Sequence, residues 1–331
     1  KKGGELEDDA LELTGGQLVD ENLIGKLEMD YTMTNDYTLK NELTIPKGRT
    51  LTVPEDTTLT IDNDGELILE EGANIDLDEG DITLLKGGKF TDKNLGLTDN
   101  IAYTLTRDYT VPVDYILRNN LTIPKGRTLT VPHNVELSVP FGKKITIKKG
   151  GELEDSSIKL SGELVDENLI GNLEKDYSIT VDYTLNEDLT VPKNKTLSIS
   201  LDRNLTVPNG KKLIVEEGGK IDIEESDDEG EIEIEGGIYI DRNLEGNDSD
   251  PKHKLKRDYT LSVDYTLKKP LTISKFTTLT VPDGVEFSVP KDKTLTIEKE
   301  GKLEDSDLKL KGGNLVDKNL EGTLEKDYTL P

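Results

Sequence analysis

The chain has 331 residues, a formal net charge of −27 and a pI near 4.5. Nucleic-acid-binding domains present a basic surface, so this charge excludes that class, and it also disfavours docking on anionic membranes. The sequence has no Cys, which excludes disulfides, thiolate metal sites and a Cys nucleophile. It has no apolar run of the ~18 residues that a membrane span needs, so we expect no membrane insertion in this segment.

The sequence is built from internal repeats. Each repeat is marked by the element Asp-x-Asn-Leu, which recurs about every 75 residues. Its Asp and Asn residues are Asp20 and Asn22, Asp92 and Asn94, Asp166 and Asn168, Asp241 and Asn243, and Asp317 and Asn319. A regular period predicts a stacked array instead of a globule around one core. We therefore expect one continuous array over 1–331, with approximate units 1–72, 73–147, 148–221, 222–298 and a partial unit 299–331.

Alternate units resemble each other more than neighbours do. Gly-Gly-Glu-Leu-Glu-Asp occurs at 3–8 and again at 150–155. This spacing predicts that the repeats of about 75 residues are paired into larger units of about 150. The chain also begins and ends within a repeat, so we expect it to be a piece of a longer array.

Each repeat contains a finer period of short apolar–polar–apolar triplets. In the first repeat the triplets begin every eight residues, at Leu43, Leu51, Leu59, Leu67 and Ile75. The triplets are typical of short strands with one face inward, and the Pro and Gly residues between them are typical of corners. Coils of about 18–24 residues with three such sides predict an all-β fold: a single elongated β-solenoid, or parallel β-helix, with a hydrogen-bond ladder running on from coil to coil. No apolar stripe of helical period is present, so we expect essentially no helix.

A six-residue step that carries tyrosines precedes each series of triplets. Its tyrosines are Tyr31, Tyr37, Tyr103, Tyr109, Tyr115, Tyr177, Tyr183, Tyr259, Tyr265 and Tyr328. These residues replace Leu in the repeat, which favours inward side chains whose hydroxyls reach backbone groups. The alternative is a row of exposed rings that stack on sugars.

Acidic clusters suggest calcium as the only cofactor for which the sequence offers ligands. Asp62, Asp64 and Glu66 resemble the start of a calcium loop, in which alternating carboxylates converge around a Gly-permitted turn. Asp227 and Asp228 form a second candidate. The competing hypothesis for each cluster is a solvated turn.

The Asp and Asn of the Asp-x-Asn-Leu element are predicted to be structural. Such side chains hydrogen-bond the backbone at corners or form ladders along a stack. We identify no catalytic residue and no cofactor-binding residue. The two histidines, His133 and His253, are far apart, and no nucleophile motif or phosphate-binding loop is present.

The phrase Leu-Thr-Ile-Pro-x-Gly-x-Thr-Leu-Thr-Val-Pro stands at 43–54 and 121–132, and a close variant stands at 271–282. It resembles the β-solenoid repeat stalks of prokaryotic cell-surface adhesins and extracellular fibre proteins. The resemblance covers nearly the whole chain and implies an exported protein, at the cell surface or outside the cell. It carries over no functional residue.

The function that follows from this resemblance is structural. We expect a segment of an extracellular filament or adhesin stalk, not an enzyme, that assembles end to end or continues in a longer chain. Its expected partners are copies of itself, through end contacts or strand addition, and a surface or polysaccharide ligand is a further candidate. A carbohydrate-binding surface module is the alternative, and a polysaccharide-degrading β-helix enzyme is a remote one.

Overall fold

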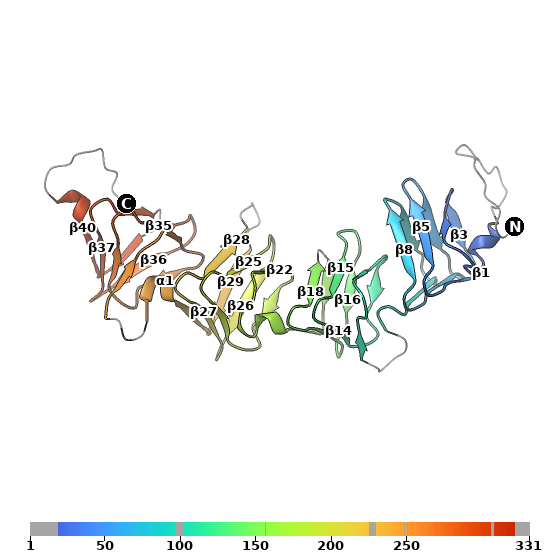
Figure 1. Cartoon of the computed structure of the whole chain (residues 1–331), viewed down its shortest axis with the longest axis horizontal. Coiled ribbons are helices and arrows are strands. Elements are labelled where there is room, and N and C mark those ends of the chain that lie inside the picture. The colour runs from blue at the N-terminus through green and yellow to red at the C-terminus, as the bar shows by residue number, and fades with distance from the viewer. Residues whose placement is uncertain are drawn as a thin grey trace. The chain divides into compact units, whose positions relative to one another are not determined.

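The computed structural model describes residues 19–96, 102–155, 157–224, 230–247, 249, 251–305 and 308–321. Within these residues the chain is an all-β parallel β-solenoid of about 12 turns, as the short-strand pattern predicts (Figure 1). The chain divides into two compact units, Lys1–Glu167 and Asn168–Pro331. Each unit contains two blocks of three sheets, and every strand pairing within a sheet is parallel.

Block 1 (25–92) opens the first unit. Its first sheet consists of β1 (Gly25–Lys26), β4 (Glu42–Ile45), β7 (Glu66–Leu69) and β10 (Lys89–Asp92). The second sheet consists of β2 (Tyr31–Thr32), β5 (Thr50–Pro54) and β8 (Asn74–Asp78). The third sheet consists of β3 (Tyr37–Leu39), β6 (Thr58–Ile61) and β9 (Asp81–Leu84).

Block 2 (103–166) repeats this order in the same unit. Its first sheet consists of β11 (Tyr103–Thr104), β14 (Leu121–Ile123), β17 (Lys144–Ile147) and β20 (Glu163–Asp166). The second sheet consists of β12 (Tyr109–Thr110), β15 (Thr128–Val131) and β18 (Glu152–Asp155). The third sheet consists of β13 (Tyr115–Ile116), β16 (Leu137–Val139) and β19 (Ile158–Leu160).

Block 3 (171–241) opens the second unit. Its first sheet consists of β21 (Gly171–Asn172), β24 (Leu189–Val191), β27 (Lys212–Val215) and β30 (Ile238–Asp241). The second sheet consists of β22 (Tyr177–Ile179), β25 (Thr196–Ile199) and β28 (Lys220–Ile223). The third sheet consists of β23 (Tyr183–Thr184), β26 (Asn204–Pro208) and β29 (Glu231–Glu235).

Block 4 (253–317) completes the second unit. Its first sheet consists of β31 (His253–Leu255), β34 (Leu271–Ile273), β37 (Thr294–Ile297) and β40 (Asn314–Asp317). The second sheet consists of β32 (Tyr259–Thr260), β35 (Thr278–Val281) and β38 (Lys302–Asp305). The third sheet consists of β33 (Tyr265–Thr266), β36 (Phe287–Pro290) and β39 (Leu308–Lys311).

Among the described residues, helix is confined to short segments that follow the Asp of four of the five repeat elements, and Asp92 is followed by a turn. In the described part of the chain these are α1 (Arg242–Glu245) and the 3-10 turns η1 (Glu21–Leu23), η2 (Glu167–Leu169) and η3 (Lys318–Leu320). The expectation of essentially no helix is therefore confirmed. None of the described helices has the length and hydropathy that a membrane crossing requires.

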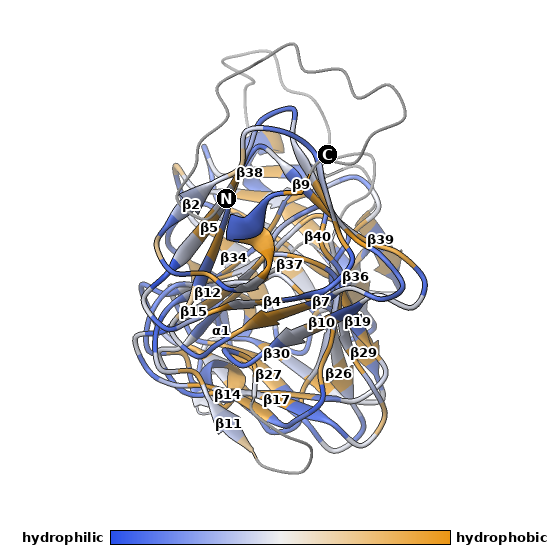
Figure 2. Cartoon of the chain, turned by 90° about the vertical axis from the view of Figure 1, so that its right-hand side faces the viewer, coloured by the Kyte–Doolittle hydropathy of each residue, from blue (hydrophilic) through white to orange (hydrophobic). Residues whose placement is uncertain are grey.

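The core is a column of aliphatic side chains. Leu43, Leu51 and Leu59 head the three sides of one coil, and each is fully buried. In strands such as β6 the burial alternates, because a strand places successive side chains on opposite faces. In Figure 2 orange, hydrophobic stretches lie along strands such as β4, and blue stretches lie along the connecting turns. Parallel pairing stacks the buried positions directly, as between Leu43 and Leu67.

The sheets differ from the sequence prediction in one respect. The backbone hydrogen bonds between described strands do not continue from one block to the next. Among the described strands, no sheet contains strands of two blocks. The four blocks begin at residues 25, 103, 171 and 253, about 23–31 residues later than the corresponding predicted units. The prediction of a continuous ladder was wrong because the Asp-x-Asn-Leu element ends one set of sheets before the next begins.

Candidate functional site

The Asp-x-Asn-Leu elements lie where one block ends and the next begins, and the element of the first unit centres on Asp92. Asp92 is the last residue of β10 and is fully buried. Its Oδ1 accepts hydrogen bonds from the backbone N–H of Asn94 at 2.9 Å and from Asn94 Nδ2 at 3.0 Å. Its Oδ2 accepts from the hydroxyl of Tyr109, in β12 of the next block, at 2.5 Å. One carboxylate therefore closes its own turn and contacts the following block.

Asn94 ties the element to the turn one coil earlier. Its Oδ1 accepts from the backbone N–H of Gly72 at 2.8 Å, and its Nδ2 lies 3.4 Å from the carbonyl oxygen of Ala73. Gly72 has a φ of +84°, a conformation that L side chains rarely adopt. The Asn amide thus supplies a donor and an acceptor to a turn whose backbone groups have no sheet partner on that side.

Arg107 of the next block reaches back to the same turn. Its guanidinium donates to the carbonyl oxygen of Ala73 at 2.5 Å, to Asn74 Oδ1 at 2.7 Å and to Asn94 Oδ1 at 3.2 Å. Phe90 and Tyr115 add an edge-to-face ring contact, with centroids 6.1 Å apart. The contacts between blocks 1 and 2 are therefore made by side chains.

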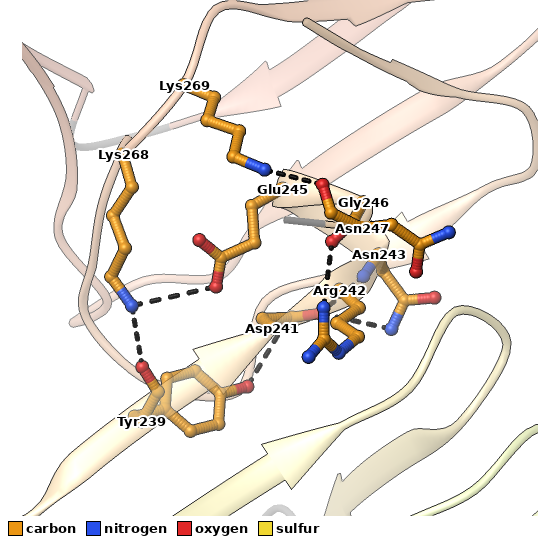
Figure 3. Close-up of polar contacts among 9 residues, drawn as sticks. All are labelled: Tyr239, Asp241, Arg242, Asn243, Glu245, Gly246, Asn247, Lys268 and Lys269. Carbon is orange, nitrogen blue, oxygen red and sulfur yellow. Dashed lines mark hydrogen bonds and ion pairs between the residues drawn. The ribbon is translucent and has the colours of Figure 1, made fainter. Parts of the chain in front are cut away.

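The second unit builds the same site around Asp241 (Figure 3). Asp241 Oδ1 accepts from the backbone N–H and from Nδ2 of Asn243 at 2.9 and 3.1 Å. Its Oδ2 accepts from the hydroxyl of Tyr259 in block 4 at 2.5 Å and from that of Tyr239 at 3.2 Å. Asn243 Oδ1 accepts from the backbone N–H of Gly218 at 2.8 Å, in parallel with the Asn94–Gly72 contact.

Two lysines of block 4 complete this second site. Lys268 Nζ donates to the carbonyl oxygen of Tyr239 at 2.8 Å and lies 3.6 Å from a carboxylate oxygen of Glu245, which is buried (Figure 3). Lys269 Nζ donates to the carbonyl oxygen of Asn247 at 2.6 Å. The ion pair neutralises part of the charge of Glu245, since an acid buried without a counterion would be strongly disfavoured.

Burial dominates the electrostatics of both sites. Burial raises the pKa of Asp241 to about 6, against the lowering effect of hydrogen bonds from Tyr259, Asn243 and Tyr239. Burial also raises the pKa of Asp92, and the hydrogen bonds from Tyr109 and Asn94 oppose it. For the Tyr259 hydroxyl, burial and the neighbouring Asp241 charge hold the pKa well above its usual value, so the phenol remains a donor.

The terminal elements show the same local geometry. Asp20 Oδ1 accepts from the backbone N–H of Asn22 at 2.9 Å, and its Oδ2 accepts from the Tyr31 hydroxyl at 2.5 Å. Asn319 donates to Asp317 Oδ1 from its backbone N–H and its Nδ2, at 2.9 and 3.0 Å. At the remaining element, Asp166 and Asn168 are both buried.

A second set of functional side chains is the Asp of the described Asp-Tyr doublets, which sequence reasoning missed. The first coil of each block has six-residue sides and lies under a coil with eight-residue sides, so the first N–H of a longer strand has no backbone acceptor. Asp36 Oδ1 accepts from the N–H of Thr58 at 2.8 Å, and Asp114 Oδ1 accepts from that of Glu136 at 2.8 Å. The same bond is made by Asp30, Asp108, Asp176, Asp182, Asp258 and Asp264, and also by Asp188, which precedes a Leu. The constant Asp-Tyr doublet was the available signal.

The tyrosines do not form an exposed row. Seven are buried: Tyr37, Tyr109, Tyr115, Tyr183, Tyr239, Tyr259 and Tyr265. Tyr31, Tyr103 and Tyr177 are half-buried, and Tyr328 lies outside the described residues. The hydroxyls of Tyr31, Tyr109 and Tyr259 bind carboxylates, whereas backbone acceptors were expected. This burial removes the observation on which the carbohydrate-binding alternative depended.

The candidate calcium ligands are not gathered into a metal site. Asp62 Oδ1 accepts from the N–H of Asn63 at 2.7 Å, Asp64 is exposed, and Glu66 pairs with Glu42 in the ladder. In the described part of the chain no group of three or more His, Asp or Glu side chains is placed to hold one metal ion. Asp227 and Asp228 lie outside that part, so calcium binding there stays a prediction.

No family model and no curated protein matches this chain. Among solved structures, a crystal structure of a TibC-catalysed hyper-glycosylated fragment of TibA, residues 55–350, is similar. The match covers 87% of this chain and 91% of that chain, at 13% sequence identity and a TM-score of 0.18. A similarity at this level carries no argument about function.

Proposed function

We propose that this chain is a structural segment of an extracellular filament or cell-surface stalk, without catalytic activity. The observation that carries the proposal is the repetition of one junction: Asp92, Asn94 and Tyr109 in the first unit are matched by Asp241, Asn243 and Tyr259 in the second. A catalytic centre needs a constellation that differs from its surroundings. A polar site that recurs at the block boundary inside each unit instead serves to connect blocks.

The net charge of the chain supports a role in which many copies stay soluble and associate only at specific contacts. The net charge of −27 makes the chains repel one another, which favours solubility over unspecific association. The partner we propose is another copy of this chain, joined at the end of its array. Parallel strands at the end of a solenoid have unpaired backbone groups on one side, and such edges pair readily with further strands.

The test is localisation of the natural protein in the cells that make it. Immunogold electron microscopy with antibodies against residues 19–321 should label filaments or projections outside the cell envelope. Labelling confined to the cell interior would overturn the proposal. Cells in which the gene is deleted are the control for the antibody.

A second measurement distinguishes a structural protein from a polysaccharide-degrading enzyme. The purified chain should release no reducing sugars from extracellular polysaccharides, with a known polysaccharide hydrolase as the positive control. Turnover that disappears when one carboxylate pair is replaced would instead identify an enzyme.

A further inference from the structure

The two blocks of a unit are joined differently from the coils inside a block. Inside block 3 and block 4, neighbouring coils share backbone ladders such as β27–β30 and β34–β37. Between described residues of the two blocks, each hydrogen bond has a side chain on at least one side. The backbone hydrogen bonds between two paired strands form and break together. Side-chain contacts between blocks can instead be lost one at a time.

Side chains of block 4 contact block 3 and α1 at several points. Among the described residues, these contacts include the Tyr259 hydroxyl on Asp241, Lys268 on Glu245 and on the Tyr239 carbonyl, and the Ser262 hydroxyl on the Ile221 carbonyl at 3.1 Å. The Arg257 guanidinium also lies against Gly218, and β31 lies against α1. The rings of Tyr239 and Tyr265 add an edge-to-face contact with centroids 6.3 Å apart. We call this set of contacts the latch.

Opening the latch exposes groups that water can satisfy. The Asp241 carboxylate, the Glu245 carboxylate and the phenol hydroxyls all gain solvent partners, and the Lys268 side chain is already 46% exposed. Opening therefore costs apolar contact and a few hydrogen bonds, each of modest net contribution. Separating two coils within a block would break several backbone hydrogen bonds at once and open the aliphatic column.

We propose that the latch is a hinge: the two blocks of a unit separate there while all sheets within the blocks remain paired. The unit then responds to bending or tension by opening at the Asp-x-Asn-Leu element before any strand is lost. The first unit has an equivalent latch in Tyr109 on Asp92 and Arg107 on Ala73. This inference goes beyond the proposed structural role and does not depend on where the protein is located.

Spin-label distance measurements test the hinge, because the absence of Cys allows labels to be placed at will. One pair joins the blocks, with Asn209→Cys in block 3 and Lys291→Cys in block 4. A second pair lies within block 3, with Lys193→Cys and Asn209→Cys. All three positions are exposed. In the otherwise unchanged chain both distance distributions should be narrow.

The latch variant is Tyr259→Phe with Lys268→Met. It should raise the ratio of open to closed units by roughly tenfold or more, because the Tyr259 contact with Asp241 and both Lys268 contacts are lost. The distribution between blocks should then broaden while the one within block 3 stays narrow. The matched control is Thr260→Val with Lys256→Met, which also removes one hydroxyl and one lysine charge from block 4. Both side chains are exposed and neither belongs to the latch, so this variant should leave both distributions unchanged.

Three outcomes would overturn the proposal. Unchanged distributions in the latch variant would mean that these contacts do not hold the blocks together. Equal broadening of both pairs would mean that the blocks melt together with the junction. Broadening in the control variant would mean that the effect is not specific to the latch. If the variant in the second unit does not fold, Tyr109→Phe with Arg107→Met and labels at Asn63 and Phe141 test the same hinge in the first unit.

Discussion

At the scale of single residues, hydrogen bonding and burial act in opposite directions on the pKa of the buried aspartates. Asp241 receives four hydrogen bonds from donors, which favours the ionised form. It is also fully removed from solvent, which favours the neutral form, and burial prevails in raising the pKa to about 6. The junction therefore contains an acid that titrates in a mildly acidic range.

This titration predicts a pH dependence with a definite sign. The folded pKa of Asp241, about 6, lies above the usual value of 3.8, so the native state holds the proton more tightly than the unfolded state. The resulting stability is complete below the unfolded pKa and is lost as pH rises through about 6. The unfolding free energy of the second unit should fall between pH 4 and 6, by at most about 1.4 kcal/mol per pH unit.

Denaturant titrations across this pH range measure the slope, and Asp241→Asn is the informative variant. The amide keeps the shape of the carboxyl group but does not titrate, so the slope should become flatter. A slope that is identical in the variant would assign the pH dependence to other carboxylates.

The two tyrosine hydroxyls next to this site should differ sharply in their contribution to stability. Tyr259 donates to Asp241, whereas the hydroxyl of Tyr265 is buried without a partner. Tyr259→Phe should lower the unfolding free energy by about 1–3 kcal/mol, since it removes a hydrogen bond to a charged group. Tyr265→Phe should be neutral or slightly stabilising because it removes an unsatisfied polar atom. Equal losses in denaturant unfolding would contradict this account.

At the scale of elements, the fold depends on how a coil with six-residue sides stacks on one with eight-residue sides. The shorter sides leave the first N–H of the next strand without a carbonyl acceptor. The Asp of each described Asp-Tyr doublet accepts that hydrogen bond instead, as Asp114 does for Glu136. The doublet thus has two structural roles. The Asp points outward and accepts the N–H at the strand end, while the Tyr points inward and packs in the core.

Removal of one such cap should have a measurable cost. Asp114→Ala leaves the N–H of Glu136 without its acceptor and should lower stability by about 1 kcal/mol, similar to the loss of a helix N-cap. Asp114→Asn keeps an acceptor oxygen and should recover most of that loss. Thermal unfolding compares the two variants, and an Asn variant as unstable as the Ala variant would show that charge, not the hydrogen bond, matters at this position.

At the scale of the whole molecule, charge is the dominant property. Ion pairs such as Lys148–Glu167 and Lys275–Glu300 match one acid with one base, so the excess of 68 acidic over 41 basic residues leaves a net charge of −27 however many pairs form. Most of these pairs lie at the surface, where each contributes little. Repulsion between the remaining carboxylates therefore opposes the compact state.

Salt should stabilise the chain by screening that repulsion. The melting temperature should rise between about 0.01 and 0.15 M NaCl, as the Debye length falls from about 30 to 8 Å. At equal ionic strength CaCl₂ and MgCl₂ should act alike, because the described residues contain no group placed to hold one metal ion. A larger shift with calcium, saturating at low concentration, would instead locate a specific site outside those residues, with Asp227 and Asp228 as the first candidates.

The sequence by itself determined the repeat, the short parallel strands and the aliphatic column, because the position of a side chain in a strand fixes whether it points inward. Leu43, Leu51 and Leu59 could be assigned to the core from their eight-residue spacing alone. Only the tertiary structure decided where the ladders stop and which side chains span the gap. Asp92 and Tyr109 are neighbours because the chain completes most of a coil between them, and no local pattern encodes that distance. Hydrophobic burial is a property of each position, whereas a hydrogen bond between blocks is a property of two segments brought together by the coil.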